Sequence, residues 1–295
     1  MTVLSQMVEY ADSLYSRPGR CSSCPNTCRG GCEQCLDSIH MHGEIRDYNC
    51  SNIAHFYVCK YIYKYSSEID RLFAVMRSVN SLDEYNILAV GAGPCNELIG
   101  VLNYMERSAV SKKVTYLGVE KNNIWQAVQG NLKSIVRGLA FQVNIKIIDD
   151  DIFNVIARIR LNRMAWKPNL LILNYVISDM VKNGANMDFF IEEIVQKIIP
   201  NMPIGSSVIL NDINHNTKAR DYFDKFAAAV NEKYLIEINK GHFVNNNRWY
   251  YSYGTRRSTN SITQTIPANI VLRYSPWAFC SSAHMIVNIL GERSI

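Results

Sequence analysis

The sequence lacks any long uninterrupted apolar run. None of its apolar stretches approaches the ~18–20 residues that a helix needs to cross a bilayer. The first residues also lack the basic start and continuous apolar core of a secretory signal. These absences argue against a membrane partner and against export, and we expect a cytoplasmic protein.

Strong charge and internal repeats are also missing. Charged residues make up 19% and hydrophobic residues 48% of the 295 residues, which argues against long disordered spans. The net charge of +5 permits a nucleic-acid partner without requiring one. The length suits one large domain or a domain with an appendage, and it does not set the oligomeric state.

Cysteines are present but unevenly distributed. Seven of the nine lie between positions 21 and 59. In a reducing compartment this density favours a metal over disulfides, because two thiolates on a tight turn can bind one cation. We expect a structural zinc site on Cys21, Cys24, Cys32 and Cys35. One of these could be replaced, or a second site completed, by Cys28, His40, His42, Cys50 or Cys59.

Two alternatives to zinc stay open. The same thiolates could hold an iron–sulfur cluster, or they could be reduced with no metal bound. The spacing Cys28-x3-Cys32-x2-Cys35 resembles that of radical S-adenosylmethionine enzymes. In that family the motif follows the first strand of a β/α barrel, whereas here it follows a helical pattern and another cysteine pair.

The N-terminal residues indicate a helical module. Apolar residues repeat at helical spacing in Leu4, Met7, Val8, Ala11, Leu14 and Tyr15. Aromatic residues after the cysteines, including Tyr57, Tyr61 and Tyr65, either pack this module on the main domain or stack on bases. We expect a Cys-rich helical module over residues 1–80 and a main domain over residues 81–295.

Apolar runs alternate with helical patterns in the main domain. The predicted strands are 87–90, 114–119, 141–148, 170–173, 208–211, 234–238 and 270–274, with a further candidate at 285–289. The predicted helices are 97–105, 122–139, 151–160, 187–199 and 220–231. This alternation predicts an α/β fold, a Rossmann-like doubly wound sheet with helices on both faces.

A strand, a glycine turn and a helix follow one another over residues 86–98, with Gly91, Gly93 and Pro94 in the turn. Glycine adopts turn angles that are closed to other residues and lets the backbone approach a ligand. Glu120 ends the next apolar run, where its two oxygens can accept hydrogen bonds from ribose hydroxyls. This order is typical of a pocket for an adenosine-bearing cofactor.

Polar residues also end the next two predicted strands. Asp149, Asp150 and Asp151 follow the third strand, where they could meet an adenine amine, although Asp149 and Asp151 also suit solvent or helix capping. Asn174 and Tyr175 end the fourth strand, where the reacting end of the cofactor is expected. Ligands bind at these carboxyl ends in open α/β sheets.

Residues 81–240 resemble class I S-adenosylmethionine-dependent methyltransferases. The turn at residues 90–94 looks like the first motif of the family, Glu120 like its ribose-binding acid, Asp150 like its adenine-side acid and residues 171–175 like its fourth motif. The resemblance implies S-adenosylmethionine as the cofactor, with Gly91 and Gly93 beside its methionine part. It also implies a seven-stranded sheet whose last pair is antiparallel.

The sequence departs from that family at three places. Ala89 stands where the family often has an acid, Cys95 replaces its third glycine, and Asn174 lacks the Pro-Pro that follows it in methyltransferases of base amino groups. These departures keep open a non-catalytic protein that binds RNA or another partner through the same fold. The glycine turn alone also fits nicotinamide-dependent dehydrogenases.

Methyl transfer is a direct displacement that does not demand a strong catalytic residue. If a base exists, Tyr175, Asp179, Asp212 and His215 are the candidates. The segment Arg248-Trp249-Tyr250-Tyr251, followed by Tyr253, Arg256 and Arg257, places cations among aromatic rings and suits an RNA acceptor. A β-hairpin with cross-strand aromatic pairs explains the same residues equally well.

Overall fold

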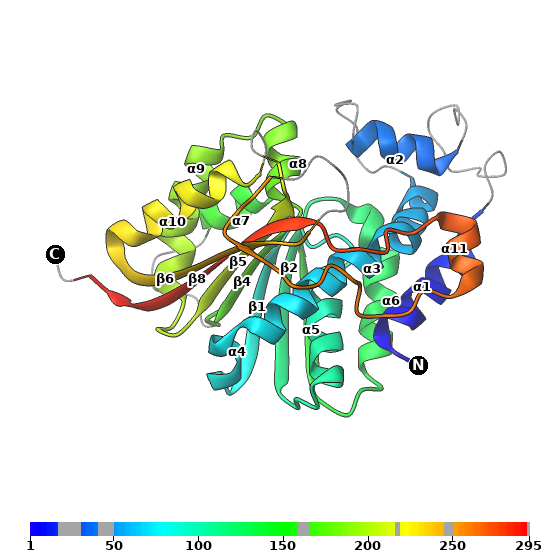
Figure 1. Cartoon of the computed structure of the whole chain (residues 1–295), viewed down its shortest axis with the longest axis horizontal. Helices are drawn as coiled ribbons and strands as arrows, with labels where there is room; N and C mark the ends of the chain where they lie inside the picture. The colour runs from blue at the N-terminus through cyan, green and yellow to red at the C-terminus, as the bar shows by residue number, and fades with distance from the viewer. Residues whose placement is uncertain (17–30, 41–49, 159–165, 216–218, 245–250, 294–295) are drawn as a thin grey trace.

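The computed structural model describes residues 1–16, 31–40, 50–158, 166–215, 219–244 and 251–293. In these residues one mixed sheet holds eight strands in the order β3-β2-β1-β4-β5-β8-β6-β7 (Figure 1). The strands are β1 (Glu84–Val90), β2 (Lys113–Glu120), β3 (Val143–Asp149), β4 (Leu170–Asn174), β5 (Ser207–Ile213), β6 (Tyr234–His242), β7 (Thr255–Arg256) and β8 (Ser282–Glu292). The predicted Rossmann-like α/β fold is therefore confirmed.

Helices lie between and around these strands. They are α1 (Val3–Leu14), α2 (Cys32–His40), α3 (Ser51–Val75), α4 (Arg77–Ser81), α5 (Asn96–Arg107), α6 (Gln126–Val136), α7 (Ile152–Arg158), α8 (Ile177–Lys182), α9 (Met187–Glu193), α10 (Asp221–Lys233) and α11 (Ala268–Tyr274). Three short turns of helix add η1 (Asn123–Trp125), η2 (Ile194–Ile198) and η3 (Ile199–Asn201). None of the helices in the described ranges is both long and apolar enough to span a bilayer.

Strands β1 to β5 pair in parallel, and β8 runs antiparallel between β5 and β6. Strand β4 is buried over Leu170–Leu173 without alternation, as expected for a parallel strand covered on both faces. The chain crosses from β3 back to β4 beside β1, so the strand order reverses between β1 and β4. In open α/β sheets, ligands bind outside the carboxyl ends of the strands at such a reversal.

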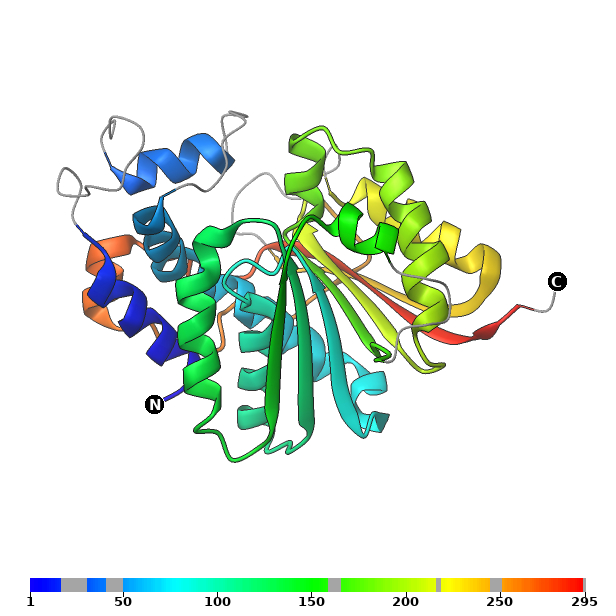
Figure 2. The same cartoon turned by 180° about the vertical axis from the view of Figure 1, so that it is seen from behind.

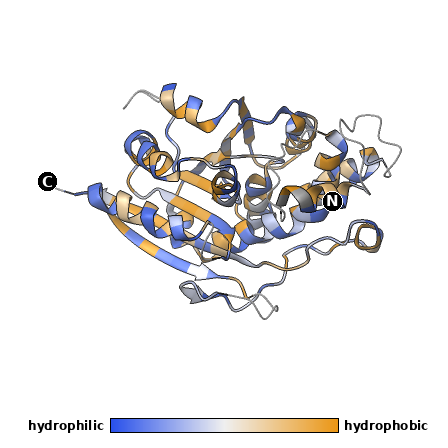
Figure 3. Ribbon diagram, turned by 90° about the horizontal axis from the view of Figure 1, so that it is seen from above, coloured by the Kyte–Doolittle hydropathy of each residue, from blue (hydrophilic) through white to orange (hydrophobic). Residues whose placement is uncertain are grey.

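Two helical layers cover the sheet (Figures 1 and 2). Helices α1, α3, α5 and α6 share one buried cluster with one face of β1, and helices α7, α9 and α10 share another with the opposite face. In Figure 3 the hydrophobic colour gathers on the strands between these layers. Because α1 and α3 belong to the same core as α5, the helical N-terminal residues pack directly on the main domain; the boundary at residue 80 stays a prediction.

The C-terminal strands differ from the prediction in two ways. Residues 270–274 form helix α11 rather than a strand, with Pro267 at its N-cap and with Ile270 and Tyr274 buried one turn apart. Leu272 between them is 87% exposed, so this apolar run is a half-buried helix and the prediction of a strand is wrong. The antiparallel pair is β6 and β8, and the short β7 makes eight strands where seven were expected.

Candidate functional site

The turn between β1 and α5 depends on its glycines. Gly91 has φ +64° and Gly93 has φ +48°, which are left-handed values that favour glycine. A Cβ atom on Gly91 would lie 2.6 Å from Cγ2 of Val176, so there is no room for a side chain. Cys95 also has a positive φ, of 65°, and is fully buried. The turn thus holds backbone close to the β4 end.

Glu120, at the end of β2, is joined to this turn. Its Oε2 accepts a hydrogen bond from the Gly93 N–H at 2.7 Å, and its Oε1 accepts one from the Asn122 N–H at 2.8 Å. Burial raises the pKa of Glu120, and these two backbone bonds oppose that rise. Each oxygen keeps a second lone pair, so the carboxylate can still accept hydrogen bonds from a diol.

The three acids after β3 have local partners. Asp149 is exposed and accepts a hydrogen bond from Gln126 Nε2 at 2.9 Å. Asp150 accepts from the Asp151 N–H and pairs with Arg158. Asp151 accepts from the N–H of Phe153 at 2.9 Å and thereby caps α7.

These acids lie beside Glu120, because β2 and β3 are in register there. Glu120 is paired with Asp149, and the Asp150 N–H donates to the Glu120 carbonyl at 3.2 Å. The structure therefore gathers the predicted ribose-side and adenine-side acids at one edge. It also gives Asp151 the capping role that was its alternative interpretation.

The residues after β4 lie beside the β1–α5 turn, on the side opposite Glu120. Asn174 Oδ1 accepts a hydrogen bond from Asn211 Nδ2 at 2.8 Å. Tyr175 has φ 58°, a strained value for a large residue, and its hydroxyl donates to Glu68 Oε1 at 3.3 Å. Asp179 is half-buried in α8.

Asp212 is fully buried in β5. Its Oδ2 accepts a hydrogen bond from the Ser178 N–H at 3.0 Å, and its Oδ1 accepts from the N–H of Ile213 at 2.7 Å. Burial raises the pKa of Asp212 to about 6. Its carboxylate therefore holds the start of α8 in place beside Tyr175.

A row of aromatic rings from α3 packs across the carboxyl ends of the strands. Tyr57, Tyr61 and Tyr65 are spaced four residues apart and face the same side of the helix. Ring centroids lie 5.2 Å apart for Tyr57 and Trp125, and 4.0 Å apart for Tyr65 and Tyr175. The row thus runs from the β2 side to the β4 side. Its four-residue spacing is the signal that could have placed it from the sequence.

The structure describes only two of the five cysteines predicted to bind a metal. Cys21, Cys24 and Cys28 lie outside the described residues. Cys32 and Cys35 begin α2, and the Cys32 sulfur accepts a hydrogen bond from Asn52 Nδ2 at 3.2 Å. Among the described residues no group of three or more His, Cys, Asp or Glu side chains could hold a metal ion. Zinc and iron–sulfur thus stay predictions.

The basic and aromatic segment is also only partly described, since Arg248, Trp249 and Tyr250 lie outside. Tyr253 packs on Phe223, and its hydroxyl donates to Asp224 at 3.3 Å. Arg257 donates to His284 Nε2 at 2.9 Å. These two residues serve internal packing, whereas Arg256 is exposed.

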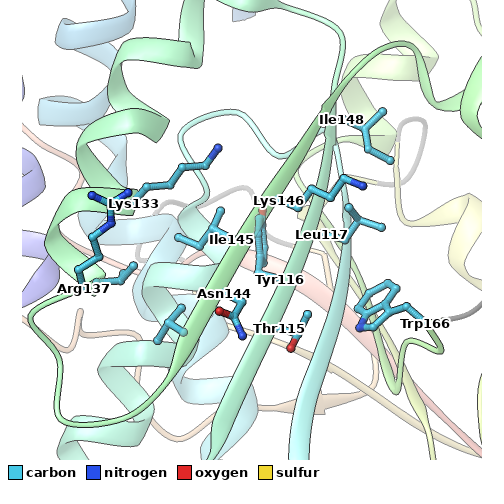
Figure 4. Close-up of a pocket in the computed structure, with 12 residues that line it drawn as sticks. Thr115, Tyr116, Leu117, Lys133, Arg137, Asn144, Ile145, Lys146, Ile148 and Trp166 are labelled. Carbon is cyan, nitrogen blue, oxygen red and sulfur yellow. The ribbon is translucent and has the colours of Figure 1, made fainter.

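A separate cavity of about 590 Å³ lies at β2 and β3 (Figure 4). Figure 4 shows Lys133 and Arg137 on one side of β3 and Lys146 with Trp166 on the other. No Asp or Glu is among the residues that line it. The charged residues that line this cavity are therefore all cationic, and none of its lining residues belongs to the turn after β1 or to the end of β4.

No protein-family model and no curated protein matches the sequence. Solved structures do resemble the fold. An rRNA methylase from Streptococcus thermophilus aligns at TM-score 0.39 and 11% identity, over 72% of this chain and 92% of that one. A plantazolicin methyltransferase in complex with SAH aligns at 0.39 and 11%, over 97% and 95%. A putative RNA methyltransferase from Pyrococcus horikoshii aligns at 0.39 and 11%, over 98% of each chain. At these values the likeness concerns the fold alone.

Proposed function

We propose that this protein is an S-adenosylmethionine-dependent methyltransferase. The observation that carries the proposal is the contact between Glu120 and Gly93, which puts a half-buried carboxylate beside a glycine turn at the reversal of strand order. A nucleoside bound at such a point has the backbone of the turn on one side. On the other side it has a carboxylate that can accept hydrogen bonds from its two ribose hydroxyls. Gly91, Pro94 and Asn174 complete the proposed cofactor site.

The polar atoms available fit this cofactor. Ala89 supplies no carboxylate, but Oδ1 of Asn96 is buried and has no hydrogen-bond partner in the described part of the chain. It offers an acceptor for an amino group near the turn. Asp150 and Asp151 lie beside Glu120 for the adenine side. S-adenosylmethionine would supply an electrophilic methyl group on a sulfonium sulfur.

RNA is the acceptor that we favour. The support is the cavity at β2 and β3, where Lys133, Arg137 and Lys146 form no ion pair with any described residue and no acid lies among the lining residues. Such a surface attracts a phosphate backbone. Tyr57, Tyr61 and Tyr65 of the predicted N-terminal module would then lie on the acceptor side.

A titration tests the central proposal. We expect S-adenosylmethionine and S-adenosylhomocysteine to bind the purified chain with one site in calorimetry, and labelled methyl groups to enter RNA. Failure of both nucleosides to bind would end the enzyme hypothesis. Binding without transfer to any acceptor would favour the alternative, a non-catalytic RNA- or partner-binding protein. Ala89 and Cys95, which depart from the first motif of the family, favour that alternative.

The metal prediction has its own measurement. Elemental analysis after anaerobic purification distinguishes zinc from iron at Cys21, Cys24, Cys28, Cys32 and Cys35. A reducible four-iron cluster that cleaves the cofactor to a deoxyadenosyl product would support the radical alternative. Stoichiometric zinc in a colourless protein would exclude it.

A further inference from the structure

Lys64 on α3 is an unusual buried cation. Its side chain lies inside the protein, with the residue only 2% exposed. No hydrogen bond or ion pair joins its ammonium to any residue in the described ranges. Its Nζ instead lies over three aromatic rings, 4.3 Å from the centroid of Trp277, 4.9 Å from Tyr175 and 5.5 Å from Tyr65. These three rings are called the aromatic cage below.

The nearest carboxylate on the same helix is already occupied. Glu68, one turn after Lys64, is fully buried, and its Oε1 accepts from the backbone N–H groups of Ser281 at 2.8 Å and Ser282 at 3.2 Å. Its Oε2 accepts from Asn211 Nδ2 at 3.1 Å. Both oxygens of Glu68 thus accept hydrogen bonds from uncharged groups, and Glu68 interacts with the Lys64 ammonium only electrostatically, without a direct ion pair.

The charges around Lys64 come from several elements. Glu68 on α3, Asp212 on β5 and Cys280 just before β8 each favour the ammonium form. Burial acts the other way and is the stronger effect, so the pKa of Lys64 is lowered. A buried cation without a direct anionic partner is costly, and a bound anion would remove that cost.

The cage lies at the reacting end of the proposed cofactor site. Tyr175 directly follows β4, and its neighbour Val176 is the residue in contact with Gly91. Tyr175 and Trp277 are both only half-buried, whereas Tyr65 is 6% exposed. The cage is therefore partly exposed at Tyr175 and Trp277.

We infer that the aromatic cage and Lys64 bind a flat ring that carries an acidic hydroxyl or imide group, held as its anion. The rings supply stacking faces, and the ammonium supplies a charge-assisted hydrogen bond to the anionic atom. This inference rests on the proposed methyltransferase function for its chemical consequence, but the anion site can be measured without it.

As the ring binds, its acidic group gives its proton to water, which leaves an anion beside the Lys64 ammonium. The anionic oxygen or nitrogen then attacks the sulfonium methyl; its bond to carbon forms as the carbon–sulfur bond breaks, and sulfur keeps the electron pair. The methylated ring is neutral and leaves, and Lys64 stays an ammonium throughout. Lys64 would thus be a catalytic residue.

The test uses 4-nitrophenol, whose anion absorbs visible light and whose neutral form does not. We expect the full chain, loaded with S-adenosylhomocysteine, to bind this probe as the phenolate below the pKa of the free phenol. Lys64→Met should weaken that binding at least tenfold and abolish the visible signal, and Lys64→Arg should retain part of it. Lys60→Met is the matched control, because Lys60 lies one turn earlier on α3, is similarly buried and is paired with Glu33.

Each outcome decides something. Phenolate binding that is equal in wild type and Lys64→Met, or absent in wild type, would overturn the inference; thermal unfolding of each variant controls for the fold. If S-adenosylhomocysteine fails to bind while Lys64-dependent phenolate binding persists, the anion site stands and the methyltransferase proposal falls. Displacement of the probe by a uridine oligonucleotide, rather than by free phenols alone, would place the ring in RNA.

Discussion

The backbone N–H of Gly93 lies 2.7 Å from Oε2 of Glu120, and this contact fastens the end of β2 to the turn after β1. The same carboxylate accepts the N–H of Asn122 and so also orders the start of the segment that leads into α6. One side chain therefore shapes the proposed nucleoside site from both sides. The first prediction follows from that double role.

Replacing Glu120 should affect ligand binding and stability together. In Glu120→Gln the new amide NH₂ would face one of the two backbone donors, so we expect a loss of about 1–3 kcal/mol in unfolding free energy. Binding of S-adenosylhomocysteine should weaken at least tenfold in calorimetry. Glu232→Gln, at an exposed position on α10, is the control and should change neither quantity.

Gly91 should not tolerate a side chain. Gly91→Ala places Cβ 2.6 Å from Val176 Cγ2 at φ +64°, so we expect about 2 kcal/mol of destabilisation in denaturant unfolding. Adding Val176→Ala should recover the part that comes from the clash, but not the part that comes from the backbone angle. Additive effects of the two changes would contradict this contact.

Gly130 provides the matched glycine control. It lies within α6, and an added Cβ would meet nothing within 4 Å. Gly130→Ala should therefore stabilise the protein by about 0.5–1 kcal/mol, because alanine favours a helix interior. Equal destabilisation at both glycines would argue against a special role for the β1–α5 turn.

The buried pair of Glu97 and Tyr116 predicts a pH dependence of stability. Glu97 is 4% exposed and accepts the Tyr116 hydroxyl, and burial raises its pKa from 4.5 to about 7. Between those values the folded state holds a proton that the unfolded chain has lost. Stability from this group is thus complete below pH 4.5 and falls by up to about 3 kcal/mol as the pH rises through 7.

Glu97→Gln should remove that slope. The amide stays neutral, so the unfolding free energy of the variant should exceed that of wild type at pH 8 and the difference should vanish toward pH 4.5. Urea unfolding at several pH values between these limits measures it. A variant whose stability runs parallel to wild type across this range would show that Glu97 does not titrate as predicted.

The cavity at β2 and β3 predicts how RNA binding depends on salt. If Lys133, Arg137 and Lys146 contact phosphates, the logarithm of the RNA association constant should fall linearly with the logarithm of the salt concentration. Each change to Glu should make that fall less steep by about 0.7. Fluorescence anisotropy with a labelled single-stranded oligonucleotide measures this slope. Lys233→Glu, an exposed cation on α10 near the opposite edge of the sheet, should leave it unchanged.

The sequence pattern of apolar and polar residues predicted much of the strand and helix order. The runs that became β1, β2 and β4 are short, apolar and separated by helical spacing, and Gly91, Gly93 and Glu120 follow from turn chemistry at their ends. The run Ile270–Tyr274 shows the limit of that approach. An apolar stretch of this length fits either a strand or a helix, and only its neighbours fixed which side chains became buried.

The sequence by itself determined the alternation of strands and helices, the glycine turn and the acid one strand away, because each depends on spacing within a few residues. Tertiary structure alone decided that Asp212 braces α8, and that Lys64 meets Tyr175 and Trp277. The first contact joins β5 to α8, and the second joins α3 to residues far along the chain. Burial, charge and partners at such places are set by which surfaces meet in the fold, and no local pattern records them.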